Sequence, residues 1–232
     1  MGSTGNRSES YHQFVSEPAS GIWSGHSFKG EGQDVINFFK DYTNNYDLIE
    51  EASQDESAVD AFNSWAVGDF MDGQQYDGFS NMEQEFQEKT RIYDYYLDRS
   101  VINKGFETRR LASAELLRGS GKTSITEEQL KKLVGTDIPA RGNMSTSAAS
   151  TGLDINFGQK PIEYVFQYPS GSRGAGMWIG DSRINDEWGS GQREFITNRD
   201  AVYTVAGYKY NKDRDVWEVK MKYKGRLPHD YS

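Results

Sequence analysis

Residues 162–168 read Ile-Glu-Tyr-Val-Phe-Gln-Tyr, and this stretch decides the fold class of the second half of the chain. Large apolar side chains occupy every second position of it. Residues 217–224, Trp-Glu-Val-Lys-Met-Lys-Tyr-Lys, repeat the alternation. A period of two gathers one set of side chains on one face of an extended segment, which is typical of a half-buried strand. Both segments therefore predict strands of a β-sheet.

Shorter β-rich runs, separated by glycine-rich turns, surround these two segments. They lie near 114–117, 143–147, 176–179, 193–197 and 201–208. One helix is expected among them, over about 127–134. Thr126 and Gln129 form a capping-box pattern, Ile125 and Leu130 suit a hydrophobic staple, and Gly135 suits a C-terminal cap.

The first half of the chain has helical periodicity instead. Between 34 and 70, apolar residues recur at a spacing that predicts two or three short amphipathic helices, and another helix is expected over about 81–98. Residues 1–33 show no sustained period, which predicts a flexible N-terminal arm.

The fold class that follows is α+β. We expect a single domain over 34–232, in which an N-terminal helical lobe (34–110) packs on a two-sheet, mainly antiparallel β-sandwich (111–232).

The composition narrows the chemistry. The 232 residues include no cysteine and only three histidines, His12, His26 and His229. A disulfide framework, a thiolate zinc site and a cysteine nucleophile are therefore excluded, and a histidine triad or metal cluster has few residues to use. Catalysis would rest on Arg, Ser, Thr, Gln and Glu side chains, without a metal.

The net charge and the hydropathy of the sequence limit the kinds of binding partner that we expect. The formal net charge is −9, and the acidic excess lies before residue 110. Such a surface repels phosphate, so duplex nucleic acid is not expected as a partner. No apolar run approaches the roughly 18 to 20 residues of a membrane span, and the first residues lack a signal pattern. We expect a soluble protein without membrane insertion, with any export signal removed or absent.

Three polar strings in the second half could carry chemistry: 117–119 (Leu-Arg-Gly), 145–147 (Ser-Thr-Ser) and 188–194 (Trp-Gly-Ser-Gly-Gln-Arg-Glu). Arg118, at the end of an expected strand, offers a fork of donors to a phosphate, and Gly119 lets a ligand approach the backbone. The plainer alternative is a surface arginine before a turn. Ser145 and Ser147 point to one face of a strand and could line a cleft, although such runs are usually solvated turns.

The third string pairs an amide with a carboxylate. In an extended segment Gln192 and Glu194 project to the same side, behind a glycine-rich loop that carries Trp188. A carboxylate there can stabilise a positively charged sugar carbon. The alternative is a charged turn that leads into a strand.

The order and spacing of these strings, over about 114–208, resembles the mono-ADP-ribosyltransferase family of the Arg, Ser-Thr-Ser, Gln-x-Glu type. The resemblance is greatest to the clostridial Rho-inactivating exoenzymes and to the enzymatic components of binary toxins. Residues 34–110 agree with the family's helical lobe in general character only.

The resemblance implies how NAD, the co-substrate, is bound. Arg118 would hold its diphosphate, and the Gly119 backbone would pair with the nicotinamide amide. The segment 169–176 looks like the family's loop over the phosphate and nicotinamide, which makes Arg173 the candidate for a second phosphate contact.

The catalytic roles are implied in the same way. Ser145 would orient the carboxylate of Glu194, and Thr146 and Ser147 would support the strand and the cleft. Glu194 would bind the nicotinamide ribose and stabilise the oxocarbenium ion as nicotinamide leaves. Because the leaving group is neutral, the reaction needs strain and a nearby negative charge rather than a strong base.

The resemblance also implies that Gln192 and Trp188 contact the acceptor of the ADP-ribose group. In the family, Gln two residues before the catalytic Glu accompanies transfer to Asn or Gln side chains rather than Arg, and an aromatic in the same loop contacts the target protein. The implied protein is a toxin or phage effector that is secreted or injected, acts in the target-cell cytoplasm on a host protein such as a small GTPase, and could have a separate translocation partner. The alternatives are ADP-ribosylation of a guanine nucleotide or nucleic acid, and a catalytically inactive binding module.

Overall fold

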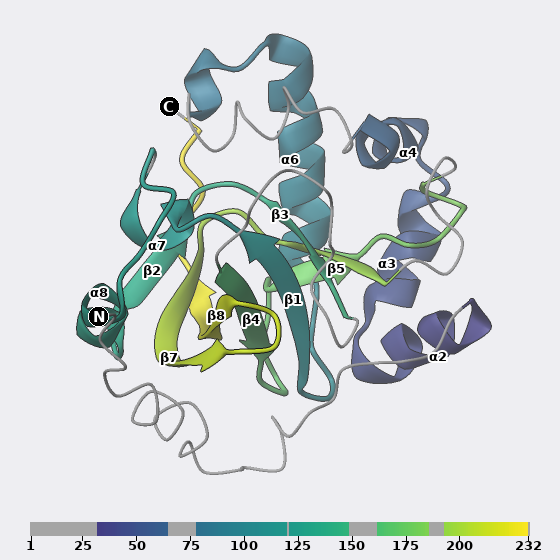
Figure 1. Cartoon of the computed structure of the whole chain (residues 1–232). Coiled ribbons are helices and arrows are strands. Elements are labelled where there is room, and N and C mark those ends of the chain that lie inside the picture. The colour runs from purple at the N-terminus through teal and green to yellow at the C-terminus, as the bar shows by residue number, and fades with distance from the viewer. Residues whose placement is uncertain (1–31, 65–77, 120, 149–161, 186–192, 232) are drawn as a thin grey trace.

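The computed structural model describes residues 32–64, 78–119, 121–148, 162–185 and 193–231. Its N-terminal helices are α2 (Gln33–Tyr42), α3 (Asn45–Ala52), α4 (Glu56–Asn63), the 3-10 turn η3 (Phe79–Asn81) and α6 (Gln84–Asp98). Figure 1 shows α2, α3 and α4 gathered on one side of the molecule. The expected helical lobe and the helix near 81–98 are confirmed, whereas the expected arm lies outside the described residues except for its last two.

Eight strands of the described segments form one hydrogen-bonded sheet in the order β2-β7-β8-β4-β1-β3-β6-β5. Their bounds are β1 Phe106–Ala112, β2 Asp137–Ala140, β3 Met144–Ser147, β4 Ile162–Tyr168, β5 Gly176–Trp178, β6 Glu194–Thr197, β7 Ala201–Asn211 and β8 Val216–Arg226. Neighbouring strands are antiparallel except β4 and β8, which run parallel. The α+β class and the mainly antiparallel sheet are confirmed.

The two-sheet detail of the expected sandwich is not confirmed, because the described strands form one continuous hydrogen-bonded sheet, which bends between β1 and β3. β4 and β6 are three strands apart, or about 14 Å in a flat sheet. The rings of Tyr168 on β4 and Phe195 on β6 nevertheless lie 5.0 Å apart. At the bend, the β1–β3 ladder consists of a single pair, Arg109 opposite Ser147. The strands β3, β6 and β5 therefore fold over the rest of the sheet.

An aromatic core fills the bend and attaches the helical lobe. The ring of Phe39 on α2 stacks on Trp178 of β5 with centroids 5.2 Å apart, and Phe195 lies edge-on to Phe106 of β1 at 5.3 Å. All four side chains are fully buried. Large rings bury much apolar area for each residue ordered, so a chain with low overall hydrophobic content can still build this core.

The structure corrects the strand expected at 114–117. These residues lead into and form most of the short helix α7 (Glu115–Arg118), in which the amides of Leu117 and Arg118 donate to the carbonyl of Ala114 at 3.0 and 2.9 Å. A helical turn leaves no strand end at Arg118.

The neighbouring strand is β1, which the helical interpretation of 34–110 missed. The expected lobe boundary at 110 falls inside it. The reason is local: Thr108 and Arg110 alternate with Phe106 on the inward side, so the segment lacks an apolar alternation. The short strand β2 was also missed, because Pro139 in its centre is typical of an edge strand or a turn.

The helix expected near 127–134 is confirmed as α8 (Glu127–Leu133). The Gln129 amide donates to Thr126 Oγ1 (3.3 Å), and the Thr126 amide donates to Gln129 Oε1 (2.9 Å). Gly135 follows with φ +83°, the left-handed conformation that favours glycine after a helix.

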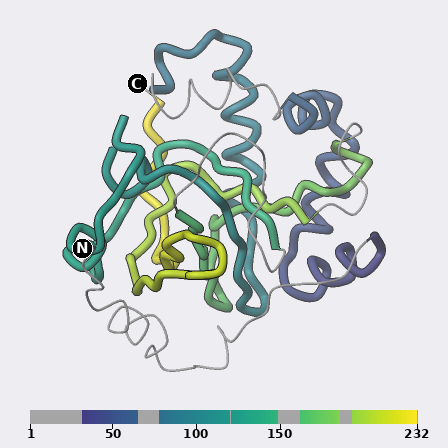
Figure 2. The backbone as a smooth tube through the Cα atoms, viewed as in Figure 1, coloured from purple at the N-terminus to yellow at the C-terminus, as the bar shows by residue number. Residues whose placement is uncertain are grey.

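The C-terminal end of the chain lies beside η3 and α6 (Figure 2). The ring of Tyr231 packs edge-on against Phe79 at 4.9 Å, and its hydroxyl donates to Asp94 on α6 at 2.8 Å. Among the described helices, none has the length and apolar character that crossing a bilayer requires.

Candidate active site

Two of the three polar strings contribute residues to neighbouring strands: Ser145, Thr146 and Ser147 lie on β3, and Glu194 begins β6. The hydroxyl of Ser145 donates to Glu194 Oε1, and Ser147 lies directly opposite Glu194 in the antiparallel register. Because side chains alternate along a strand, Ser145, Ser147 and Glu194 occupy one face of this ladder. Ser145 and Glu194 are each partly exposed, so a ligand can reach the pair.

The opposite face of the same ladder points into the core. Thr146 is fully buried, and its hydroxyl donates to the carbonyl of Phe195 at 2.6 Å. Beyond the ladder, the Ala148 amide donates to the carbonyl of Arg193 at 2.9 Å. These contacts fix the register, and a slip of β3 by one residue would turn Ser145 into the core and away from Glu194.

Two arginines of β1 adjoin this pair. Arg110 Nη1 donates to the carbonyl of Ser145 at 2.7 Å. Arg109 lies opposite Ser147 and so shares the face of Glu194. Its guanidinium turns toward β4, where Nη1 lies 3.0 Å from Oε2 of the fully buried Glu163.

Arg118 and Gly119 make different contacts. Arg118, on α7, donates from Nη1 to the carbonyl of Ser124. The Gly119 amide donates to the carbonyl of Glu115 at 2.7 Å, and its own carbonyl accepts from the Lys122 amide at 3.2 Å. The described contacts therefore do not join Arg118 to Ser145 or Glu194, and both main-chain groups of Gly119 are already used within this turn.

The remaining candidates are not brought to the pair by the described contacts. Arg173 is exposed in the turn before β5, and its carbonyl accepts from the Tyr223 hydroxyl at 2.7 Å. Trp188 and Gln192 lie outside the described residues, so the interpretation of the acceptor loop stays a prediction.

One side chain of helix α6, Tyr93, interacts electrostatically with Glu194. Burial, and next the negative charge of Glu194, raise the pKa of the Tyr93 hydroxyl on α6 well above its ordinary value. Tyr93 is fully buried and stays neutral. In the part of the chain that the structure describes, no three His, Asp or Glu side chains are grouped to hold a metal ion.

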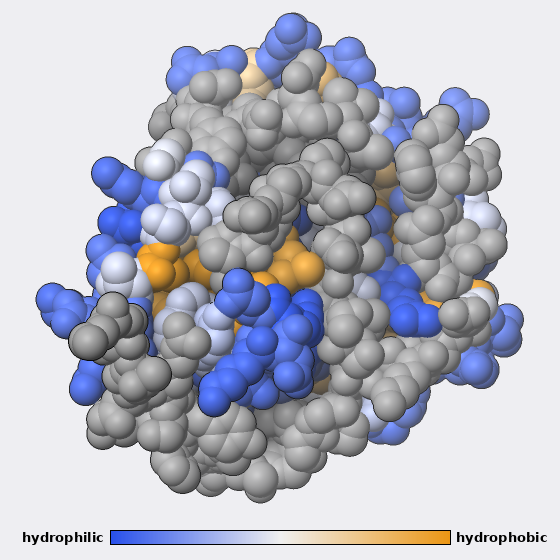
Figure 3. Space-filling model, viewed as in Figure 1, coloured by the Kyte–Doolittle hydropathy of each residue, from blue (hydrophilic) through white to orange (hydrophobic). Residues whose placement is uncertain are grey.

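A cavity of about 420 Å³ lies elsewhere, between the end of α8 and strands β7 and β8. Its lining includes Val134, Val205, Lys222 and Lys224 and none of the candidate site residues. Figure 3 shows a mostly hydrophilic described surface on one face, broken by a short apolar strip. We place the candidate site at the Ser145–Glu194 contact, because the cavity lining holds no carboxylate to stabilise a positive charge.

Solved structures share this architecture. Plx2a, an ADP-ribosyltransferase toxin from Paenibacillus larvae, matches with a TM-score of 0.65 over 83% of this chain and 96% of that chain, at 15% sequence identity. The chain has the ADP-ribosyltransferase fold. The C3 exoenzyme from Clostridium limosum matches over 85% of this chain and 98% of that chain (TM-score 0.62, 16% identity).

The ADP-ribosyltransferase fold extends to binary toxins. BECa, an ADP-ribosylating toxin of a binary enterotoxin of C. perfringens, matches over 83% of this chain and 48% of that chain (TM-score 0.63, 15% identity). Neither a protein-family model nor a curated protein matches the sequence. The resemblance to C3-like exoenzymes and binary-toxin components is therefore confirmed at the level of the fold.

Sequence reasoning missed Arg109 and Arg110 in this ADP-ribosyltransferase fold. The available signal was the doubled arginine directly after Thr108, in the middle of a segment short enough for a strand. The register with β3 could not be obtained from that signal, because it depends on residues 35 positions further along the chain.

Proposed function

We propose that this protein is an NAD-dependent mono-ADP-ribosyltransferase that transfers ADP-ribose to a protein side chain and releases nicotinamide. The observation that carries the proposal is the hydrogen bond from Ser145 to Glu194 on neighbouring strands of an ADP-ribosyltransferase fold. One solved structure of the same fold, C3stau2 from S. aureus, contains NAD.

The chemistry needs one well-placed negative charge. The bond between ribose C1′ and the nicotinamide nitrogen breaks, and its electron pair neutralises the pyridinium ring. The ribose becomes an oxocarbenium ion, which the Glu194 carboxylate stabilises. Ser145 holds that carboxylate in place, and Thr146 and Ser147 support the strand. The acceptor nucleophile then attacks C1′ and loses a proton.

The diphosphate is assigned to the two arginines of β1 in place of Arg118. It carries two negative charges, and guanidinium groups bind phosphate through two parallel hydrogen bonds. Arg109 shares the face of Glu194, whereas Arg110, on the opposite face of β1, reaches the edge of the ladder at the carbonyl of Ser145. Arg109 would exchange its contacts with the carboxylates of Glu163, Glu107 and Glu218, at 3.0, 3.8 and 3.9 Å, for the phosphate. Arg173 remains the candidate for a further phosphate contact.

The acceptor and the route of action are proposed from the sequence and from the relatives. Gln192 and Trp188 would face the acceptor, with an Asn or Gln side chain of a host protein preferred over Arg and small GTPases as the first candidates. C2-I is the enzymatic component of the C2 toxin, and BECa belongs to a binary enterotoxin. A secreted or injected protein that acts in the target-cell cytoplasm, with a separate translocation partner, would fit this class.

Incubation of the full chain with labelled NAD and host lysate tests the proposal. We expect label on protein and release of nicotinamide, and we expect Glu194→Gln to abolish transfer while NAD still binds. Mass spectrometry of the products distinguishes a protein acceptor from a guanine nucleotide. Tight binding of a target without nicotinamide release by the wild type would contradict the enzymatic assignment.

The arginine assignment has a matched test. Arg109→Ala and Arg110→Ala should each raise the KM for NAD by about tenfold or more, since a charged hydrogen bond contributes roughly 1.5 to 3 kcal/mol. Arg118→Ala, on α7, should leave the KM unchanged. The reverse pattern would restore Arg118 as the diphosphate ligand.

A further inference from the structure

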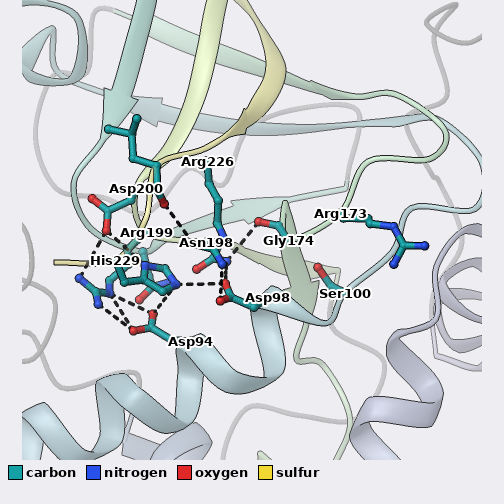
Figure 4. Close-up of polar contacts among 12 residues, drawn as sticks. Asp94, Asp98, Ser100, Arg173, Gly174, Asn198, Arg199, Asp200, Arg226 and His229 are labelled. Atoms are coloured by element: carbon teal, nitrogen blue, oxygen red, sulfur yellow. Dashed lines mark hydrogen bonds and ion pairs between the residues drawn. The ribbon is translucent and has the colours of Figure 1, made fainter. Parts of the chain in front are cut away.

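A largely buried cluster of charged side chains, in which only Asp98 and Arg226 are about a quarter exposed, holds the C-terminal tail, residues 227–231, against the body of the protein (Figure 4). The tail contributes His229, whose side chain is 5% exposed. Its partners come from three other places: Asp94 and Asp98 on α6, Asn198, Arg199 and Asp200 in the turn after β6, and Arg226 at the end of β8. No candidate catalytic residue takes part in these contacts.

Both nitrogens of the His229 ring face carboxylates. Nδ1 lies 3.2 Å from Asp200 Oδ2, and Nε2 lies 3.0 Å from Asp98 Oδ1 and 3.4 Å from Asp94 Oδ1. An ionised carboxylate only accepts hydrogen bonds, and a neutral imidazole carries a proton on one nitrogen alone. A neutral ring would therefore leave one nitrogen lone pair directed at a carboxylate, whereas in the imidazolium both nitrogens donate to the carboxylates that they face.

The charge balance of the cluster also favours a protonated His229. Arg199 donates from Nε and Nη2 to Asp94 at 2.9 and 2.8 Å, and Arg226 Nη2 donates to Asp98 at 2.5 Å. These two arginines face three carboxylates, the third being Asp200, and a charged His229 makes the cluster neutral. Loss of the His229 proton would leave one buried negative charge without compensation, which is costly in a water-poor site.

Other ionisable groups around the tail do not change this balance. Burial, together with a hydrogen bond to Asp94, raises the pKa of the Tyr231 hydroxyl to about 12, so Tyr231 remains neutral. The Arg91 guanidinium of α6 lies over the Phe79 and Tyr231 rings, 4.8 and 5.6 Å from their centroids. Asp230 is exposed, and its carbonyl accepts from Arg199 Nη1 at 3.3 Å.

We propose that the C-terminal tail is a protonation-dependent latch, docked while His229 carries a proton on each ring nitrogen and released when one of those protons is lost. The latch contacts the turn that directly follows β6, the strand that carries Glu194. Asn198, directly after β6, donates to Asp98 at 2.7 Å, and the Leu227 amide donates to the carbonyl of Asp200 at 2.9 Å. Release of the tail would break the hydrogen bond from the Leu227 amide to Asp200, and the turn after β6 would lose that contact.

The direction of the pH dependence follows from linkage. Burial alone lowers the pKa of His229, but hydrogen bonds to Asp200 and Asp98 and the charge of Asp94 outweigh burial and raise it above the ordinary value. Docking is therefore fully stabilised below about pH 6.5, the value of a solvated histidine. The stabilisation is lost as the pH rises through the raised pKa of the docked state.

Hydrogen exchange of the full chain, followed by mass spectrometry from about pH 5 to about pH 9, tests the latch. After correction for the intrinsic pH dependence of exchange, we expect the opening constant of the tail amides to rise by up to about tenfold per pH unit above the solvated pKa. His229→Gln keeps a polar side chain without a charge and should remove this dependence. Tail exchange that does not change with pH in the wild type would overturn the proposal.

Asp200→Asn provides a second variant that keeps the backbone. Asp200 has φ +60°, a conformation that Asn tolerates well, and the substitution removes one carboxylate from the cluster. We expect a lower His229 pKa in an NMR titration and latch opening at lower pH. Thermal melting confirms that the variant folds. An unchanged His229 pKa in Asp200→Asn, or a wild-type pKa at or below the ordinary value, would contradict the latch.

Discussion

Neighbouring residues of β3 have different roles, because one faces the candidate site and the next packs in the core. Ser145 and Thr146 are neighbours with nearly the same functional group, yet one binds the Glu194 carboxylate and the other binds the carbonyl of Phe195 inside the core. The difference is the alternation of the strand, which turns each successive side chain to the opposite face.

Ser145→Ala should therefore lower the kcat of ADP-ribose transfer by roughly 10- to 100-fold, because a hydrogen bond to a charged group contributes about 1.5 to 3 kcal/mol. Affinity for NAD and melting temperature should change little. Steady-state kinetics and calorimetric NAD titration measure both effects. A purely structural role of Ser145 would instead lower the melting temperature and leave kcat in place.

Gly176 shows how closely β5 approaches β6. A Cβ built there would lie 2.2 Å from the carbonyl oxygen of Ile196 and 2.6 Å from the Phe195 ring, whereas at Gly225 it would meet nothing within 4 Å. The two glycines have nearly the same φ, 151° and 152°. Gly176→Ala should destabilise the fold by about 3 kcal/mol in urea unfolding. Gly225→Ala, with the same backbone strain but open space, should cost clearly less.

Among the elements, α8 is specified almost entirely by its own residues. The reciprocal hydrogen bonds of Thr126 and Gln129 satisfy amides that a helix start otherwise leaves without partners. The sequence predicted this helix to within one residue at its C-terminal end.

Thr126→Ala should lower the free energy of unfolding by about 1 kcal/mol, because the amide of Gln129 loses its acceptor. Thr123→Ala, an exposed position three residues earlier, is the matched control and should have no measurable effect. Chemical denaturation of both variants gives the comparison. Equal losses would mean that the capping box does not stabilise α8.

Strand β1, unlike α8, is not specified by its own residues. Its pairing with neighbouring strands makes this segment a strand. It pairs with β4 over seven consecutive residues and with β3 at one. Polar side chains at inward positions are tolerated because Thr108 contacts the Tyr168 hydroxyl at 3.3 Å and Arg110 reaches the Ser145 carbonyl at the edge. Both partner strands come later in the sequence.

On the scale of the whole molecule, stability should depend on pH in two directions. Burial opposes ionisation of Asp98 and Asp181, but hydrogen bonds from His229 and Asn198 in the first case, and from Arg183 in the second, hold their pKa values below the ordinary 3.8. That stabilisation is present above pH 3.8 and is lost as the pH falls through the lowered values. The raised pKa of His229 acts oppositely.

The melting temperature should therefore be highest between about pH 4 and about pH 6.5 and should fall on both sides. The negative net charge above the isoelectric point of about 4.9 adds self-repulsion on the alkaline side. Calorimetric scans across this range measure the profile. In His229→Gln the alkaline decline should become shallower, and a melting temperature that rises steadily through pH 8 would contradict the assignment of His229 as charged.

The sequence by itself determined the elements whose stabilising contacts are local or periodic. These are the amphipathic helices of the N-terminal lobe, the capped helix α8 and the strands with strict alternation, together with the Ser-Thr-Ser and Glu positions on β3 and β6. Tertiary structure decided the bend of the sheet, the identity of β1 and its arginines, and the docking of the tail through His229. Each of these depends on contacts between residues far apart in the chain, and no spacing within one segment encodes which distant strand or charge will lie beside it.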